Sequence, residues 1–364
     1  MLKLIQGDCL KKLKDLEDCS VDSVVTDPPY GISFLGNKWD YDVPSVEVWK
    51  ECLRVLKPGG HLLAFSGTRT QHRMAVRIED AGFEIRDMIA WVYGSGFPKS
   101  HNISKAIDKK MGAEPEIAKE GKDIFGSEIT KTKTSGISGS FGDGEWKSEK
   151  PISLEITEAT SPEAKIWKGW GTAIKPALEP ITMAKKKIKE KNTADNVLKY
   201  GTGGLNIDGS RVGERFPANL IHDGGDQVLQ VLPGESARFF YCPKTSKKER
   251  DQGLEGFEKK QYSHDGRIKS IENPYQRNKS KSKNNHPTVK PIALMEYLVK
   301  LVTPPGGIVL DPYMGSGTTG VACRRNGFGF VGIELDRQYY DICQARIEYE
   351  NKNKEDQGGL FGDV

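Results

Sequence analysis

The 364-residue sequence contains no run of about 18 consecutive apolar residues, the length that a membrane-spanning helix requires. Its N-terminus lacks the basic, then apolar, then small-residue order of a secretory signal peptide. The six cysteines include no Cys-x-x-Cys pair, so their spacing indicates neither a zinc site nor a disulfide framework. These absences favour a cytoplasmic protein with reduced thiols, no bound metal and no membrane partner.

A strong excess of one charge is also missing, since 54 Lys and Arg stand against 50 Asp and Glu. The charge is unevenly distributed, however. Between Lys244 and Lys283 there are 12 basic and 6 acidic residues, a local net charge of +6 (12 − 6). Such a stretch suits a phosphate backbone, to which cationic proteins bind largely through counterion release. A solvated surface loop is the alternative explanation.

Apolar runs and segments of helical periodicity alternate in the first hundred residues. Strands are predicted at 2–5, 21–26, 61–65 and 85–93, and helices near 46–56 and 71–81. The same alternation returns between 291 and 350. This pattern predicts an α/β fold with a doubly wound, mostly parallel sheet.

The middle of the chain lacks this alternation. Residues 113–165 are rich in Lys, Gly, Ser, Thr and Glu, and residues 200–285 are rich in loops. Loops of this length are uncommon in a compact domain and are usually functional or disordered. The exception is the segment 177–184, which we expect to return to the sheet as a strand beside the one near Trp91.

The most informative motif is Asp27-Pro28-Pro29-Tyr30, which directly follows the apolar pair Val24-Val25. Open α/β sheets bind their ligands at the carboxyl ends of the strands. There the Asp27 carboxylate and the Pro28 carbonyl can accept hydrogen bonds from a ligand that carries N–H groups. The consecutive prolines restrict the backbone, and the Tyr30 ring offers a face for stacking on a base. Ordinary turn chemistry is the alternative explanation of this tetrapeptide.

A second motif, Asp311-Pro312-Tyr313-Met314-Gly315-Ser316-Gly317-Thr318-Thr319, follows the predicted strand 308–310. Its glycines allow a tight turn and close approach to a ligand, and the helix that begins near Thr318 directs N–H groups at an anion. Glu334 ends the next predicted strand and can hold ribose hydroxyls. An oxidoreductase that binds a dinucleotide is an alternative class, but it leaves Asp27–Tyr30 and the basic stretch unexplained.

Together and in this order, the two motifs resemble those of the DNA amino-methyltransferases, in the permuted group called beta. The segments Trp170–Ala177 and Asn206–Gly209 look like motifs of a phage- or mobile-element-type branch of this family. The resemblance implies a Rossmann-like fold of circularly permuted motif order, with S-adenosyl-L-methionine as cofactor and double-stranded DNA as substrate. Asp at the first motif position favours N6 of a flipped adenine over N4 of cytosine. A non-catalytic DNA-binding relative is a further alternative, which the intact Asp27 counts against.

The resemblance also assigns the site residues. Those expected in catalysis are Asp27, Pro28, Pro29 and Tyr30, and those expected at the cofactor are Asp8, Cys9, Thr288, Lys290, Asp311, Pro312, Gly315, Gly317, Thr318 and Glu334. Asp8 either accepts from the adenine of the cofactor or only caps the following helix. Trp91, Tyr93 and Phe97 line the base pocket or belong to the core, and His286 is expected to be structural.

These assignments divide the chain into functional parts. Residues 1–111 form the catalytic half, 112–285 an irregular target-recognition insert, 286–350 the cofactor half, and 351–364 a flexible tail. A homodimer and a cognate restriction endonuclease are partners that the resemblance leaves open.

Overall fold

A computed structural model of the chain describes residues 1–33, 38–94, 100–113, 116–117, 121–122, 128–129, 157–224, 240–261 and 281–359. The chain forms two compact units, which are Met1–Gly94 with Leu178–Val364, and Ser95–Ala177. The functional boundaries expected at 111 and 285 stay predictions, because the compact units follow packing rather than function.

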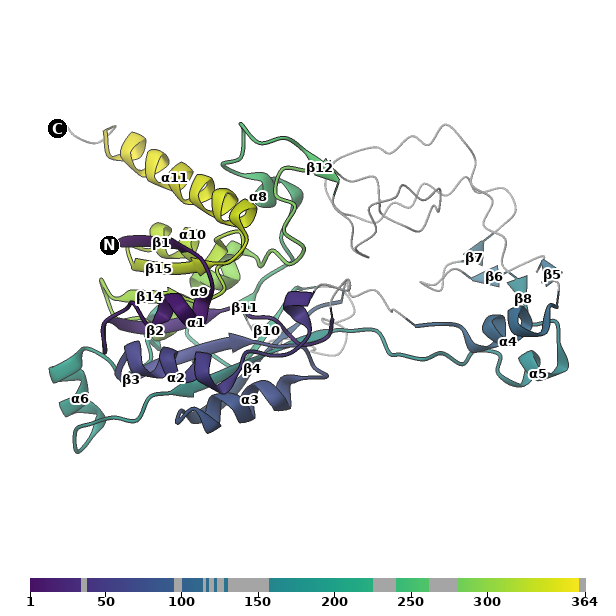
Figure 1. Cartoon of the computed structure of the whole chain (residues 1–364), viewed down its shortest axis with the longest axis horizontal. Coiled ribbons are helices and arrows are strands. Elements are labelled where there is room, and N and C mark those ends of the chain that lie inside the picture. Colours follow the sequence, from purple (N-terminus) through teal and green to yellow (C-terminus); the bar gives the residue numbers. More distant parts are fainter. Residues whose placement is uncertain are drawn as a thin grey trace. The chain divides into compact units, whose positions relative to one another are not determined.

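Within the described residues, the larger unit has a nine-stranded sheet of order β1-β15-β14-β2-β3-β9-β4-β10-β11 (Figure 1). Its strands are β1 (Leu2–Gln6), β2 (Val21–Thr26), β3 (Leu56–Phe65), β4 (Glu84–Val92), β9 (Leu178–Lys185), β10 (Leu220–His222), β11 (Phe240–Tyr241), β14 (Ile308–Asp311) and β15 (Gly329–Glu334). Strand β9 is antiparallel to β3 and β4, and the other neighbouring pairs of this sheet are parallel. The expected mostly parallel α/β sheet is therefore confirmed.

Helices cover both faces of this sheet. The helices described in the larger unit are α1 (Cys9–Leu13), α2 (Val46–Val55), α3 (Gln71–Asp80), α6 (Thr193–Tyr200), α8 (Lys247–Asp251), α9 (Ile292–Val302), α10 (Thr318–Arg325) and α11 (Arg337–Gly359), with short 3-10 turns at Lys38–Asp40 and Asp208–Ser210. Val25 and Leu63 pack in one cluster with α9, α10 and α11, whereas Val24 and Leu62 pack in another with α1, α2 and α3. Successive strand residues point to opposite faces, so the sheet is doubly wound.

Two element boundaries differ from those predicted. Strand β3 begins at Leu56 and runs through Gly59 and Gly60, where a break before the strand was expected. The extra length finds backbone partners: Gly59 donates to the Lys186 carbonyl, and the Lys186 N–H donates to the Gly60 carbonyl. At the other end of the chain, α11 continues to Gly359, so the predicted tail from 351 is helical over nine residues. No proline and no glycine interrupts the sequence there before Gly358.

The smaller unit contains two helices, α4 (Ile103–Met111) and α5 (Pro162–Ile166), among its described residues. Its short strands are β5 (Glu116–Ile117), β6 (Gly121–Lys122), β7 (Glu128–Ile129) and β8 (Thr157–Glu158). The buried Asp108 carboxylate of α4 accepts hydrogen bonds from the backbone N–H groups of Thr160 and Ser161, which directly precede α5. These hydrogen bonds link the two helices. Across the described residues of both units, no helix is long and apolar enough to span a membrane.

Candidate active site

The Asp27–Tyr30 segment leaves the carboxyl end of β2, a central strand between β14 and β3. The Asp40 carboxylate shapes the turn that follows, because it accepts backbone N–H groups from Tyr30 at 2.6 Å and Gly31 at 2.9 Å. Gly31 has a φ of +65°, which favours glycine. The Thr70 hydroxyl holds the Tyr30 carbonyl at 2.5 Å. The backbone of the motif is therefore fixed by contacts that do not involve the Asp27 carboxylate or the Tyr30 hydroxyl.

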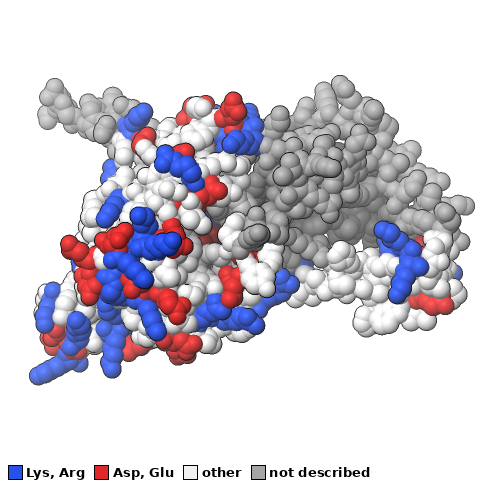
Figure 2. Space-filling model, in the orientation of Figure 1, with Lys and Arg blue, Asp and Glu red and all other residues white. Residues whose placement is uncertain are grey.

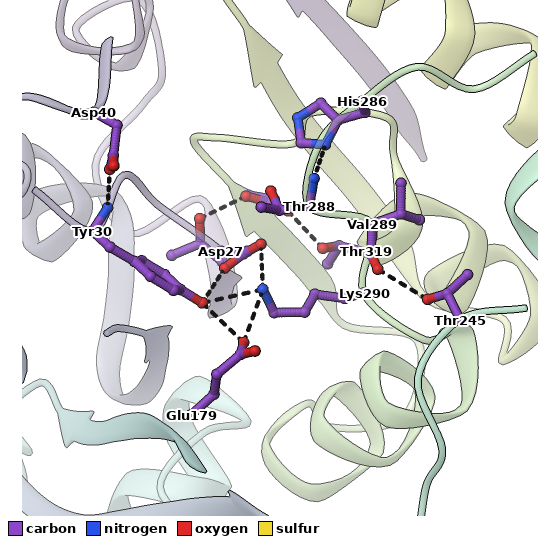
Figure 3. Close-up of polar contacts among 12 residues, drawn as sticks. Asp27, Tyr30, Asp40, Glu179, Thr245, His286, Thr288, Val289, Lys290 and Thr319 are labelled. Atoms are coloured by element: carbon purple, nitrogen blue, oxygen red, sulfur yellow. Dashed lines mark hydrogen bonds and ion pairs between the residues drawn. The ribbon is translucent and has the colours of Figure 1, made fainter. Parts of the chain in front are cut away.

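Beyond the end of β2, side chains from three parts of the chain form what we call the carboxylate–lysine cluster: Asp27, Tyr30, Glu179 and Lys290 (Figure 3). The Lys290 ammonium lies 2.6 Å from Asp27 Oδ2 and 3.3 Å from Glu179 Oε2. The Tyr30 hydroxyl lies 2.8 Å from Asp27 Oδ1 and 3.3 Å from Glu179 Oε2. Both donors therefore bridge the same two carboxylates.

The electrostatics of this cluster follow from burial and charge. Burial raises the pKa of Asp27, and the Lys290 ammonium opposes that rise. Burial acts to lower the pKa of Lys290, but the Asp27 and Glu179 carboxylates outweigh it and the net shift is upward. Burial and both carboxylates raise the pKa of Tyr30 well above its usual range. At neutral pH the cluster thus contains a charged ammonium and a neutral phenol.

Glu179 and Lys290 enter the cluster from two separate segments of the chain. Glu179 is the second residue of β9 and pairs with Trp91 of β4. Lys290 precedes α9, and its neighbours are held by the basic stretch, in which Thr245 donates to the Val289 carbonyl at 2.9 Å. The Glu249 carboxylate accepts the N–H of Ile292 at the start of α9 at 2.6 Å. The α8 region therefore supports the position of Lys290.

Three basic residues of the 244–283 stretch make contacts within the chain. Arg250 donates to the His286 carbonyl at 2.8 Å, and Lys283 donates to the Glu255 carbonyl at 2.9 Å. The Lys244 ammonium lies 3.6 Å from the centroid of the Tyr93 ring. On the face drawn in Figure 2, Lys and Arg are interspersed with Asp and Glu over the described surface of the larger unit. A DNA contact by this stretch stays a prediction, and it depends on the other basic residues of the stretch. Those between 262 and 280 lie outside the described residues.

The glycine-rich loop between β14 and α10 is anchored by the buried Asp311. One Asp311 oxygen accepts from the Thr26 hydroxyl at 2.7 Å, and the other accepts from the Thr319 hydroxyl at 2.6 Å. Burial raises the pKa of Asp311 to about 6. Thr26 is the last residue of β2, so this contact places the two sequence motifs side by side although 285 residues separate the bonded pair.

Glu334 ends β15, the strand next to β14. Its carboxylate accepts the N–H of Gly315 at 2.9 Å and that of Asp336 at 2.8 Å. Burial raises the pKa of Glu334 to about 7. Helix α10 begins at Thr318, and its N-cap residue Gly317 provides no side-chain cap, so the first N–H groups of the helix can bind an anion. The loop therefore presents hydrogen-bond donors beside a carboxylate.

The two loop glycines are required by packing within the chain. A Cβ atom at Gly317 would lie 2.4 Å from the Cys343 sulfur of α11, and Gly317 has a φ of +81°. A Cβ atom at Gly315 would lie 2.8 Å from His286 Nε2. Burial lowers the pKa of His286 to about 3, so its neutral ring packs against the loop. This is a structural role, as expected for His286.

The remaining predicted residues are placed as follows. Asp8 caps α1 by accepting the Lys11 N–H at 3.1 Å. Cys9 and Thr288 are partly buried, and Pro28, Pro312 and Thr318 are buried. Trp91 is 2% exposed and donates to the Cys242 carbonyl, which makes it a core residue, and Tyr93 packs beside it. Phe97 lies outside the described residues. The cofactor roles of these side chains stay predictions.

Glu179 is the cluster member that sequence reasoning missed. It directly precedes the buried run that begins at Pro180, so the available signal was a charged residue entering an apolar strand. Lys290 was predicted to contact the cofactor, whereas the structure places its ammonium on Asp27. These two residues of the ion pair are 263 positions apart, and local pattern could not connect them.

Acceptor carboxylates and a glycine-rich loop at the carboxyl ends of adjacent parallel strands are typical of α/β enzymes with a nucleotide-like cofactor. The sequence profile of the N6_N4_Mtase family, described as DNA methylase, matches residues 21–345. The chain therefore belongs to this DNA methylase family.

Individual proteins resemble the chain at lower identity. The Type II methyltransferase M.HindIII of Haemophilus influenzae is 23% identical, over 96% of this chain and 96% of its own length. The Type II methyltransferase M.HpaI of Haemophilus parainfluenzae is 21% identical, over 96% of this chain and 74% of its own length. The solved M1.HpyAVI–SAM complex is 19% identical, covers 95% of this chain and 99% of that one, and has a TM-score of 0.45.

Proposed function

We propose that this DNA methylase transfers a methyl group from S-adenosyl-L-methionine to N6 of adenine in double-stranded DNA. The observation that carries the proposal is the position of the Asp27 carboxylate, at the end of β2 and beside the Asp311-anchored loop. Asp rather than Ser at the first motif position favours adenine over cytosine in this family.

The residues around the loop fit the cofactor. The uncapped N-terminus of α10 suits the methionine carboxylate, because helix N–H groups and the helix dipole both favour an anion. The Glu334 carboxylate suits the ribose hydroxyls, and Asp8 suits the adenine amino group. When bound there, the cofactor supplies an electrophilic methyl group.

The Asp27–Tyr30 segment binds the target base, which accepts the methyl group. An exocyclic amine is a weak nucleophile, and it reaches this site only when its base leaves the duplex stack. Asp27 and the Pro28 carbonyl accept its two N–H groups and so direct the nitrogen lone pair. The Asp27 charge stabilises the positive charge that develops on the nitrogen, and the carboxylate then accepts the released proton. The Tyr30 ring supports the extrahelical base.

Methylation of unmodified genomic DNA with tritiated cofactor tests the proposal, followed by mass spectrometry of the nucleosides. We expect N6-methyladenine from the wild type and none from an Asp27→Ala variant. Recovery of N4-methylcytosine would overturn the base assignment, and absence of any tritium transfer would overturn the activity.

The relatives named Type II methyltransferases support a place for this chain in a restriction–modification pair. A cognate restriction endonuclease and a homodimer are accordingly proposed partners. The expected cytoplasmic location follows from the DNA substrate.

A further inference from the structure

We propose that Glu179 is a positioning residue for methyl transfer, which takes over the Lys290 ammonium when the target amine binds Asp27. The inference rests on the proposed function, because the exchange requires an amine that competes with Lys290 for the Asp27 carboxylate. It assigns a role to a β9 residue that lies outside both sequence motifs.

Side chains of the protein itself already donate hydrogen bonds to the Asp27 carboxylate. Lys290 lies 2.6 Å from Asp27 Oδ2, and the Tyr30 hydroxyl lies 2.8 Å from Asp27 Oδ1, so each carboxylate oxygen already has a donor. A target amine needs the same acceptor. The Lys290 charge also cancels the negative charge that Asp27 contributes to the reaction. A carboxylate oxygen can accept a second hydrogen bond, so the amine can bind beside Lys290, but the full Asp27 charge acts on that amine only when the distance between Lys290 and Asp27 lengthens.

A buried ammonium cannot be released without a second partner. The Lys290 side chain is 8% exposed, and an unpaired charge at such a position is strongly unfavourable. Glu179 provides that partner, because its carboxylate is already 3.3 Å from Lys290 Nζ and its side chain is only 19% exposed. A small displacement converts the longer contact into the main ion pair, and Lys290 stays charged throughout.

Tyr30 can follow the same exchange. Its hydroxyl is 3.3 Å from Glu179 Oε2, so it can donate to Glu179 when Asp27 turns to the amine. The backbone of Glu179 is fixed, since it pairs with Trp91 in the β4–β9 ladder. The Glu179 carboxylate therefore stays within reach of both donors when they leave Asp27.

An unfolding experiment tests the exchange without cofactor or DNA. The variants are Asp27→Asn, Glu179→Gln and the double variant, and the measured quantity is the denaturant midpoint. Either carboxylate alone can hold Lys290, so we expect the double variant to lose more stability than the sum of the two single losses. The cycle is run in a Tyr30→Phe background, because the Tyr30 hydroxyl bridges the same two carboxylates, and there the excess loss should vanish when Lys290→Met is added. Additive losses, or an excess that persists without Lys290, would overturn the proposal.

A kinetic experiment tests the consequence for catalysis. Glu179→Gln should lower the single-turnover rate of methyl transfer about 100-fold, as when a preorganised electrostatic contact is removed from an active site. Cofactor and DNA affinities should stay within twofold, and Glu179→Asp should recover part of the rate. The matched control is Glu190→Gln, because Glu190 pairs at the surface with Lys199 and should keep the wild-type rate.

The outcomes separate this inference from the proposed function. An active wild type together with an unimpaired Glu179→Gln variant would overturn the role of Glu179 and leave the methyltransferase assignment intact. A wild type that transfers no methyl group would overturn the proposed function, and with it any role of Glu179 in catalysis. The unfolding cycle would then still decide whether Glu179 can hold the Lys290 ammonium.

Discussion

We expect the free energy of unfolding of the cofactor-free protein to fall as the pH rises, in part because Glu334 ionises. The Glu334→Gln variant should lack this part of the fall. Burial raises the pKa of Glu334 from 4.5 to about 7. Between these values the folded protein holds a proton that the unfolded chain has released, so a rise in pH favours unfolding. The stabilisation is fully present below about pH 4.5 and is lost as the pH passes through the folded-state pKa near 7.

The magnitude follows from the size of the shift. One pKa unit corresponds to about 1.4 kcal/mol, so the move from 4.5 to about 7 gives a change of roughly 3 kcal/mol in the free energy of unfolding. Urea unfolding of wild type and variant across pH 4.5–8 measures it. Burial lowers the pKa of His61 to about 4 and that of His286 to about 3, which makes stability rise with pH. Both histidines are present in both proteins, so their effect cancels in the difference curve.

Parallel stability curves for wild type and Glu334→Gln would refute this reasoning. Glu348→Gln, an exposed change on α11, is the control and should leave the pH dependence unaltered. The same shift predicts proton release when the cofactor binds, because ribose hydroxyls favour the ionised carboxylate as their acceptor. Calorimetry near pH 6 in two buffers of different ionisation enthalpy measures that release.

Three further predictions concern the acceptor, the loop and the basic stretch. Asp27→Ala should abolish methyl transfer and leave cofactor affinity nearly unchanged, so calorimetric loss of cofactor binding with retained activity would reverse the role assigned to Asp27. Gly317→Val should weaken cofactor binding severely and also lower the free energy of unfolding by about 2–4 kcal/mol, because its Cβ meets Cys343; unchanged urea unfolding would contradict the clash. Changing Lys279, Lys281 and Lys283 together to Gln should flatten the dependence of log affinity for DNA on log salt concentration, by about one unit for each phosphate that is no longer neutralised. Identical slopes for wild type and variant would favour the alternative explanation, a solvated loop. Because Lys283 donates to the Glu255 carbonyl, we expect about two units rather than three.

The sequence by itself determined the sheet and the location of its ligand-binding edge. Buried apolar runs ended by Asp27 and Asp311 are local patterns, since a strand needs only a few consecutive residues that suit a buried sheet. The carboxyl ends of parallel strands then meet at one edge. This rule places the Asp27–Tyr30 segment and the glycine-rich loop at the same edge of the sheet, and the pairing of β2 with β14 brings them side by side, as the Thr26–Asp311 hydrogen bond shows.

Only the tertiary structure decided which side chains share that edge. Lys290 lies on Asp27 rather than free for the cofactor, and Glu179 reaches both because β9 enters antiparallel between β3 and β4. Gly317 is required by its packing against Cys343 of α11. These contacts join residues far apart in the chain, and they depend on strand order and helix packing. No local periodicity encodes such information, because the partners of a buried charge are chosen by the fold that surrounds it.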